Sequence, residues 1–424
     1  MLLNKIKDKL TDKKVIIYIL TVILSFVILF VFSKWAYKDI VRFDIDSTAE
    51  TYVAKVERIG EKKILDGSYD ESGVQHDDIY IYFTAKITKG ELKGKYVDAV
   101  QIIEGANLVA PTDVEVGRKI ILMENVSYEN AESDYVLFEF VRTDALIILL
   151  GLFCVLLVVF GRMKGFNTIV SMILTVLSVF AVFVPSVLSG KNIYLWAIMC
   201  CVYITIMTLL IVQGVNKKSF AAGFGCVSGV CLAGGLFKIT DHVIKLTGNT
   251  TADLVELKAL DTPKTIDLKA IIFAAIIIGA VGAIMDVAMS VASSLYEIRE
   301  NSPEISFSKL FASGLTIGRD MMGTMANTLV LAYIGSSLAT VVMLFAYEQS
   351  LIETLNREMI VVDILQALVG SLGILFTIPL TSLISSALYT NYKFGGIKRV
   401  KNVKKEKPAK PVTQDEIDFD NSLF

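Results

Sequence analysis

The sequence predicts a polytopic α-helical membrane protein with about eight transmembrane helices and a small all-β extracytoplasmic domain between the first and second of them. The chain is 54% hydrophobic and its mean hydropathy is +0.60, well above that of a soluble domain. Its apolar residues are grouped in runs long enough to cross a bilayer. One polar segment, 45–142, breaks this pattern with short stretches of strand length.

Eight apolar runs can each cross roughly 30 Å of hydrocarbon. They cover residues 15–34, 143–160, 166–188, 193–213, 219–237, 270–292, 321–346 and 360–388. The first run is longer than the apolar core of a signal peptide, and no small-residue cleavage site follows it. We therefore expect an uncleaved anchor helix.

The distribution of basic residues predicts the orientation. Lysine and arginine gather in the head, in the connections after the second, fourth and sixth runs, and in the tail. With eight spans all of these lie on one side, which the positive-inside rule makes cytoplasmic. We expect a multi-pass protein of the plasma membrane with both termini in the cytoplasm. Its segments are the basic head and anchor 1–34, the outer β-domain 45–142, the seven-helix membrane domain 143–390 and the basic, disordered tail 391–424.

The outer segment contains five stretches of strand length, separated by glycine-containing or proline-containing turns, among them Gly60–Lys62. Five short strands predict a small antiparallel barrel or sandwich, a class that includes the oligonucleotide/oligosaccharide-binding barrel. The segment has one histidine, no cysteine and no recognisable pair of nucleophile and base. We expect a gating or partner-docking cap.

Composition argues against several other classes. The five cysteines lie in apolar runs at spacings unlike those of zinc ligands, and the histidines, His76 and His242, are far apart. We expect no metal site and no cofactor. Basic residues beside apolar runs indicate topology, so we expect the lipid bilayer and no nucleic acid as a partner. No cytosolic segment is large enough for a catalytic domain, so we expect no enzyme and no catalytic residues.

Asp286 lies in the middle of the sixth apolar run, where a carboxylate costs several kcal/mol. Polar residues with helical spacing accompany it, and a second polar face occupies the next run. We predict that the two faces meet and form a proton or substrate pathway. The alternative is that Asp286, protonated or bonded to Asn327, only holds two helices together. The candidate pathway residues are Asp286, Ser290, Ser293, Thr324, Asn327 and Thr328.

Three further features accompany this pathway. A candidate cytoplasmic polar cluster comprises Glu297, Arg299, Arg319 and Asp320. Small residues that let helices approach closely in lipid include Gly225, Gly229, Gly279 and Gly282. The segment 301–320 carries an apolar stripe, which predicts a separate short amphipathic helix on the cytoplasmic surface.

Residues 279–298, GAVGAIMDVAMSVASSLYEI, together with 318–337, GRDMMGTMANTLVLAYIGSS, resemble the YibE/F family of bacterial membrane proteins. The resemblance extends through most of 45–390. It implies the topology described above and little about chemistry.

Residues 296–301, YEIREN, followed by 318–328 are also similar to the export-motor subunit SecF. There a span with a membrane carboxylate ends in an acidic-Arg-Ile-Arg-Glu segment. On that register the SecF carboxylate falls on Ser290, one turn from Asp286, and Arg319 matches an arginine that enters the next span. The large periplasmic domain of SecF is absent here. The similarity implies that 166–388 form half of a resistance-nodulation-division-like domain.

Two classes of function follow from the sequence. The first is a transporter or transporter subunit, proton-coupled through Asp286, in which a six-span half needs a second copy or a paired membrane subunit. The second is a non-transporting membrane scaffold, or a partner-binding protein, whose outer β-domain docks another molecule.

Overall fold

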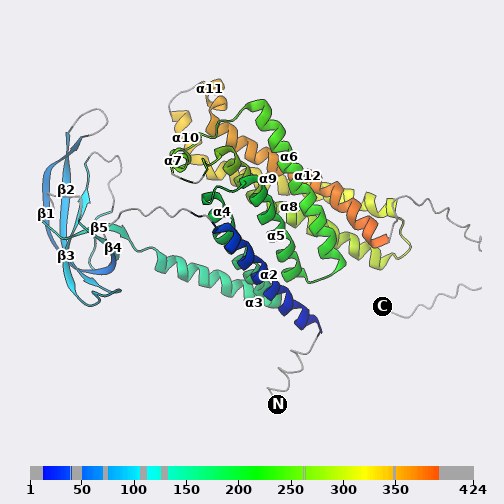
Figure 1. The fold of residues 1–424 in the computed structure, drawn as a ribbon, viewed down its shortest axis with the longest axis horizontal. Helices are drawn as coiled ribbons and strands as arrows, with labels where there is room; N and C mark the ends of the chain where they lie inside the picture. The colour runs from blue at the N-terminus through cyan, green and yellow to red at the C-terminus, as the bar shows by residue number, and fades with distance from the viewer. Residues whose placement is uncertain are drawn as a thin grey trace, which may run out of the picture.

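The computed structural model contains a five-stranded barrel near the N-terminus and a bundle of long helices (Figure 1). It describes residues 13–38, 40, 50–69, 75–105, 112–125, 132–260, 262, 264–346 and 350–390. The start of the basic head and the tail 391–424, on which the predicted orientation partly rests, lie outside these residues.

The barrel strands are β1 (Thr51–Tyr69), β2 (Gln75–Ile87), β3 (Tyr96–Ile103), β4 (Lys119–Glu124) and β5 (Tyr135–Phe140). They close in the order β1-β2-β3-β5-β4, and all neighbours are antiparallel except β3 and β5, which are parallel. A closed five-stranded barrel of this kind has the architecture of the oligonucleotide/oligosaccharide-binding type. Alternate residues of β2, such as Ile81, Phe83 and Ala85, are buried inside it.

The turn predicted at Gly60–Lys62 is wrong. These residues lie inside β1, which continues to Tyr69, and the pairing of β1 with β2 shifts register between Ile59 and Lys62. A bulge at this point bends the strand without ending it. Glycine suits the site because a Cβ on Gly60 would lie 3.1 Å from the carbonyl oxygen of Tyr82.

The last strand of the barrel leads directly into the long apolar helix that follows it in the chain. β5 ends at Phe140, and α3 (Thr143–Ser178) begins almost at once. The Lys119 ammonium on β4 lies 2.6 Å from the Asp144 carboxylate in the first turn of α3. The Arg142 guanidinium bonds the Glu139 carboxylate at 2.5 Å, which lowers the pKa of that carboxyl group. The barrel and the start of α3 are therefore joined by the chain and by side chains.

A sharp reversal divides α3. The helical stretch Thr143–Leu188 has 46 residues, which at 1.5 Å per residue would span about 69 Å, more than twice the hydrocarbon thickness. Arg162 has φ 49° and ψ −128°, outside helical geometry. A Cβ on Gly165 would collide with the carbonyl oxygen of Leu157, so the chain doubles back here. The reversal falls between the predicted runs 143–160 and 166–188.

The stretch continues through a π-helical turn, η1 (Val179–Phe183), and α4 (Val184–Leu188). The other long helices are α2 (Lys13–Ala36), α5 (Ile193–Gln213), α6 (Lys217–Ile244), α8 (Leu268–Asn301), α9 (Phe307–Ser336) and α12 (Glu358–Thr390). Shorter helices are α7 (Ala252–Ala259), α10 (Leu338–Ala346) and α11 (Leu351–Asn356).

Six helical stretches of the described chain are long and apolar enough to cross a membrane. They are Ile16–Ala36, Thr143–Leu188, Ile193–Gln213, Lys217–Ile244, Leu268–Asn301 and Glu358–Thr390. The second of these contains the reversal at Arg162, and α9, which holds most of the seventh predicted run, is not among the six. The membrane-helix class therefore holds, while the count of eight stays a prediction.

The separate surface helix predicted over 301–320 is wrong. α9 starts at Phe307, capped by the Ser306 hydroxyl, and runs without interruption to Ser336. In its apolar stripe Leu310 is fully buried, and Leu315 and Ile317 are half-buried against the core of the bundle. The break instead falls at Ser337, between α9 and α10, inside the predicted run 321–346. The physical reason is that no proline lies between 307 and 336, and the glycines that lie there at 314 and 318 are held in the helix by packing against α12.

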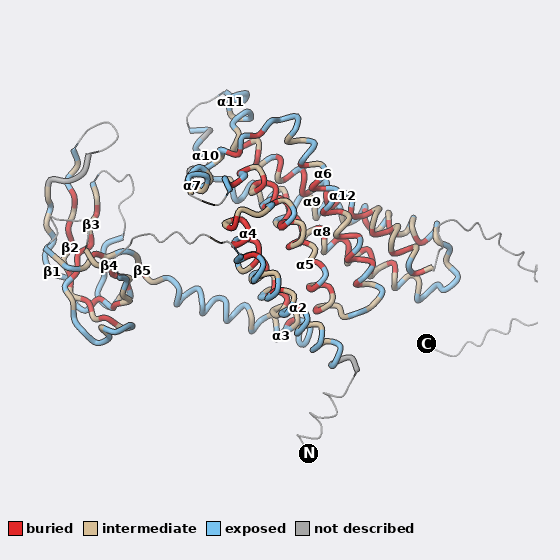
Figure 2. Tube along the Cα trace, in the orientation of Figure 1, coloured by how far each residue is buried: buried red, intermediate tan, exposed pale blue. Residues whose placement is uncertain are grey.

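The centre of the bundle is α12, which packs against α6, α8 and α9. Figure 2 shows buried residues concentrated where these helices meet, whereas the first half of α3 is exposed along most of its length. On α6, Gly225 and Gly229 lie so close to α12 that a Cβ would collide with the hydroxyls of Thr381 and Thr377. The absence of two side chains lets the two backbones approach each other closely.

α9 meets α12 in the same way on another face. A Cβ on Gly314 would lie 2.5 Å from the Ser382 hydroxyl, and one on Gly318 would collide with Ile378. Two pairs of glycines, each four residues apart, thus receive residues of α12 that are also four apart. The pair on α6 was predicted from the sequence, and the pair on α9 was not.

We expect Gly229→Val to destabilise the bundle by about 1–3 kcal/mol, because the new side chain would push α12 away from α6. Gly235→Val is the matched control, because Gly235 lies on the same helix with nothing within 4 Å of an added Cβ. Melting temperature and the monodisperse fraction in size-exclusion chromatography measure the effect. Equal loss in both variants would mean that valine harms the helix itself and not the contact.

Candidate functional site

Asp286 lies on the exposed face of α8. Ile284, two residues earlier, is buried against Gly229 of α6 and Gly373 of α12. Two residues turn an α-helix by about 200°, so Asp286 lies on the side of α8 opposite to Ile284. Its neighbour on the same face, Gly282, is also exposed, with nothing within 4 Å of an added Cβ.

The two predicted polar faces do not meet within one chain. Among the described residues, no side chain or backbone group forms a hydrogen bond or ion pair with Asp286, so the bond to Asn327 considered in the helix-pairing alternative is absent. The hydroxyls of Thr324 and Thr328 bond carbonyls of their own helix, at 2.9 and 2.8 Å. Ser290 and Ser293, which are half-buried, likewise form no side-chain hydrogen bond within the described chain.

The reason lies in how α9 is rotated. Gly314 and Gly318 face α12, so the residues half a turn away face outward. Asn327 is nine residues after Gly318, which corresponds to about 900°, or two and a half turns. Asn327, Thr324 and Thr328 are accordingly exposed. Packing of the glycines therefore decides where the polar side chains of α9 point.

The predicted cytoplasmic cluster is divided into separate contacts. Glu297 forms an ion pair with Lys218 of α6, with 2.7 Å between oxygen and nitrogen. Arg299 donates to the carbonyl of Ile305 at 3.2 Å and so fixes the connection that precedes α9. Arg319 and Asp320 are exposed and bond neither of these residues in the described chain. The four residues therefore do not form one site.

The predicted packing glycines also differ among themselves. Gly225 and Gly229 contact α12 as described above. A Cβ on Gly279 would lie 2.8 Å from the Tyr333 hydroxyl of α9, so this glycine makes a helix contact too. Gly282 faces open space, so within one chain it is not a packing position.

A line of buried hydroxyls on α12 was not predicted. We call it the α12 hydroxyl line; its members are Thr377, Thr381, Ser382, Ser385 and Ser386, all with 0% exposure. The Thr377 hydroxyl donates to the carbonyl of Gly373 at 2.7 Å. The hydroxyls of Thr381, Ser382 and Ser386 have no hydrogen-bond partner among the described residues, whereas that of Ser385 lies beside the Tyr389 hydroxyl. The signal was present in residues 377–386, TIPLTSLISS, which repeat hydroxyls at helical spacing in an apolar run.

Two acidic residues of α12 were also missed. Glu358, at its start, accepts from the backbone amides of Thr247 and Gly248, at 2.7 and 2.6 Å, and from the Thr247 hydroxyl at 2.5 Å. Asp363, one turn further on, lines a cavity of about 240 Å³ with Tyr333 of α9 and residues of α10. Asp363 interrupts the last predicted apolar run and could have been found there by its charge.

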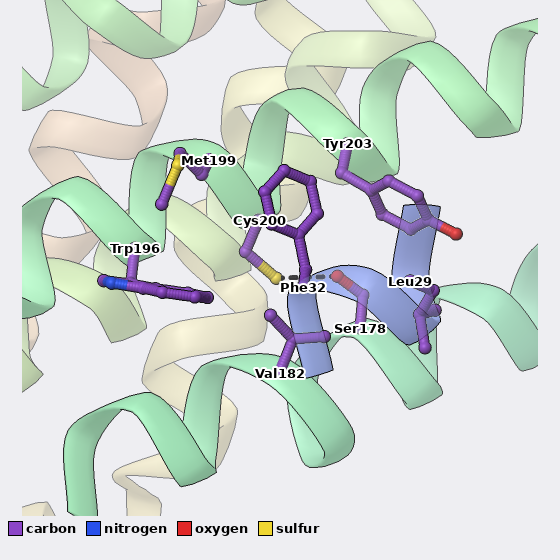
Figure 3. A pocket seen from close by; sticks show the side chains of 8 residues that line it. All are labelled: Leu29, Phe32, Ser178, Val182, Trp196, Met199, Cys200 and Tyr203. Atoms are coloured by element: carbon purple, nitrogen blue, oxygen red, sulfur yellow. Dashed lines mark hydrogen bonds between the residues drawn. The ribbon is translucent and has the colours of Figure 1, made fainter. Parts of the chain in front are cut away.

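Another cavity lies between α2, α5 and the stretch around η1 (Figure 3). Trp196, Tyr203 and Phe32 form much of its lining, and Ser178 Oγ lies 2.9 Å from Cys200 Sγ. Its volume is about 10 Å³, room for a single water molecule at most. This cavity is a packing feature of the bundle and too small for a substrate.

In the described part of the chain, no three histidine, cysteine, aspartate or glutamate side chains gather as metal ligands. The fold and the polar residues thus define a membrane protein with long apolar helices and a β-barrel domain, in which the described polar groups buried at the centre of the helix bundle are uncharged hydroxyls.

A model of the YibE/F-like protein family matches residues 149–391, more than half of the chain. The chain therefore belongs to the YibE/F-like family, as its sequence suggested. No curated protein matches it, and no solved structure does. The similarity of 166–388 to SecF and to resistance-nodulation-division domains stays a prediction from the sequence.

We expect Glu358→Ala to loosen the segment that follows α6, because three hydrogen bonds to one carboxylate are lost. A loss of about 1–2 kcal/mol should raise the rate of tryptic cleavage at Lys245 or Lys258 by roughly 5- to 30-fold. Glu256→Ala is the control, since Glu256 is exposed on α7 in the same segment. An unchanged cleavage rate in Glu358→Ala would contradict the anchoring role.

Proposed function

We propose that this protein is a proton-coupled secondary transporter, or a subunit of one, in the plasma membrane, with Asp286 as its proton carrier. The observation that carries the proposal is the exposure of Asp286 on an apolar helix, without a partner in the described chain. A carboxylate in hydrocarbon costs several kcal/mol or more, and membrane carboxylates of this kind commonly belong to ion or proton pathways. A purely structural helix contact would have paired Asp286 inside the chain.

The exposed position also supports an assembly. Asp286 shares its face of α8 with Gly282, where a second helix could approach closely because no side chain is in the way. A second copy of the chain, or a paired membrane subunit, would shield the carboxyl group from lipid and provide hydrogen-bond partners. The proposed transporter is therefore at least a two-part assembly.

Proton transfer would follow from the two states of the carboxyl group. The neutral acid is tolerated in a low-dielectric environment, whereas the anion requires water, a cation or hydrogen-bond donors. Asp286 would accept a proton where an aqueous path reaches it and release the proton where a path from the other side does. The polar residues exposed on α9, Thr324, Asn327 and Thr328, would contribute to such a path from a neighbouring subunit.

A second candidate is a non-transporting scaffold whose outer barrel docks another molecule. The joint between the barrel and α3, strengthened by Lys119 and Asp144, favours it, because a docking module needs a fixed connection to its membrane anchor. In both candidates the barrel is a cap or docking module and the protein is not an enzyme.

The proposed orientation places both termini in the cytoplasm. In a variant without native cysteines, Glu91→Cys in the exposed turn before β3 should react with an impermeant maleimide in intact cells. Ser308→Cys in the first turn of α9 should react only after the membrane is made permeable. The opposite pattern would reverse the orientation, and labelling of both sites in intact cells would place the barrel and the start of α9 on one side.

Asp286→Asn separates transport from helix pairing. Asparagine has the size and the hydrogen-bonding capacity of the acid but cannot titrate. Proton flux under an imposed gradient is measured in proteoliposomes with an internal pH dye. We expect Asp286→Asn to lower this flux by at least about tenfold, because removal of an essential proton-transfer group typically costs roughly 10²-fold or more in rate. Asp286→Glu should keep part of the flux, and Asp253→Asn on α7 should keep all of it. A folded Asp286→Asn protein with unchanged flux would leave the scaffold as the better candidate.

A further inference from the structure

The α12 hydroxyl line is separate from Asp286. Thr377 and Ile284 both contact Gly229 of α6, so the hydroxyl line lies on the buried side of α8. Asp286 lies on the opposite, exposed side of the same helix. The proton pathway proposed above therefore does not use these hydroxyls, and their presence needs another explanation.

Helix packing alone does not explain them. A buried hydroxyl without a hydrogen bond costs on the order of 1–3 kcal/mol. Thr377 avoids this cost by donating to the carbonyl four residues earlier, but Thr381, Ser382 and Ser386 have no partner among the described residues. Alanine at these positions would give the same close approach to glycine without a polar atom to bury. Three such residues in one turn and a half of helix point to a polar ligand.

The surroundings of the hydroxyl line allow the helices to separate. Thr381 and Ser382 face glycines of α6 and α9, so no large side chains interlock there. Pro379 lies inside α12 just before these residues. Proline removes one hydrogen bond of the helix, the one to the carbonyl of Leu375, and is a common cause of helix kinks. The segment from Pro379 to Thr390 can therefore tilt away from α6 and α9 about a built-in hinge.

We infer that the hydroxyl line of α12 lines an aqueous path that opens between α12, α6 and α9. Water is the ligand with the best chemical fit, because a hydroxyl both donates and accepts and so carries no preference for either sign of charge. The path would start at the end of α12 near Thr390 and extend to Thr377, about 20 Å into the membrane. In the proposed orientation it opens to the cytoplasm.

Cysteine accessibility tests this path in the full-length protein. In a cysteine-free variant, Thr381→Cys, Ser382→Cys, Ser385→Cys and Ser386→Cys are each nearly isosteric with the native residue. Their reaction with a charged, impermeant methanethiosulfonate is measured in inside-out vesicles and in intact cells. Ile374→Cys is the matched control, because Ile374 lies on the same helix with the same 0% exposure but outside the hydroxyl line.

We expect the four hydroxyl-line cysteines to react from the cytoplasmic side about tenfold faster than Ile374→Cys, because reaction requires an opening that admits water. Rates no faster than that of Ile374→Cys would overturn the path. Ser308→Cys in the same preparations reports the orientation separately, so reaction of the hydroxyl-line cysteines from the face opposite to Ser308→Cys would overturn the cytoplasmic opening.

A measurement on the unsubstituted protein covers the case in which the variants fold poorly. Backbone amides of residues 381–387 should exchange with deuterium about tenfold faster than those of 366–373 in the same helix, since only the former segment lines the path. Equal protection of the two segments would contradict the inference. Neither experiment depends on Asp286, so the path can fail while the proposed proton carrier stands, or the reverse.

Discussion

The membrane part of this protein depends on the close approach of α12 to two neighbours. In lipid the burial of apolar surface gives no drive for helices to associate, so contacts between backbones and small side chains carry the association. Gly225 and Gly229 of α6 and Gly314 and Gly318 of α9 provide this approach. The side chains of Ile284 and Leu329 can then fill the space beside Gly373 and Gly370 of α12. A single side chain added at one of these glycines would move α12 away from its neighbour and break several contacts at once.

The same contacts determine where polar residues lie. Because α9 turns its glycines toward α12, its threonines and Asn327 are turned outward, and because α8 turns Ile284 inward, Asp286 is turned outward as well. The hydroxyls of α12 are among the polar groups that remain buried inside the bundle. The membrane domain therefore holds two distinct polar features, a carboxyl group on its surface and uncharged hydroxyls in its centre. Each can be tested without disturbing the other.

Much of the fold could be predicted from the sequence. Hydropathy located the long helices, because apolar runs of this length suit a lipid environment, and alternation in 45–142 located all five strands of the barrel, because alternate residues of a strand are buried. The bulge at Gly60 and the continuity of α9 could not be predicted, because local residue types at both places allow either a break or a continuation. The polar residues of the candidate site, such as Asp286, could be recognised in the sequence by their residue type. The direction in which their side chains point could not be predicted. Whether Asp286 and Asn327 meet depends on the rotation of both helices, which is set by glycines elsewhere in the chain.

The joint between the barrel and α3 couples the barrel mechanically to the helices of the membrane part. β5 passes directly into the helix, and Lys119 with Asp144 ties a second strand to its first turn. The first half of α3 is exposed along most of its length, so few contacts hold it against the bundle, and Arg162 marks its far end. A rotation of the barrel would thus be transmitted along the first half of α3, a helix of about 27 Å, to the reversal at Arg162. A force applied to the barrel would in this way reach the helices that follow Arg162.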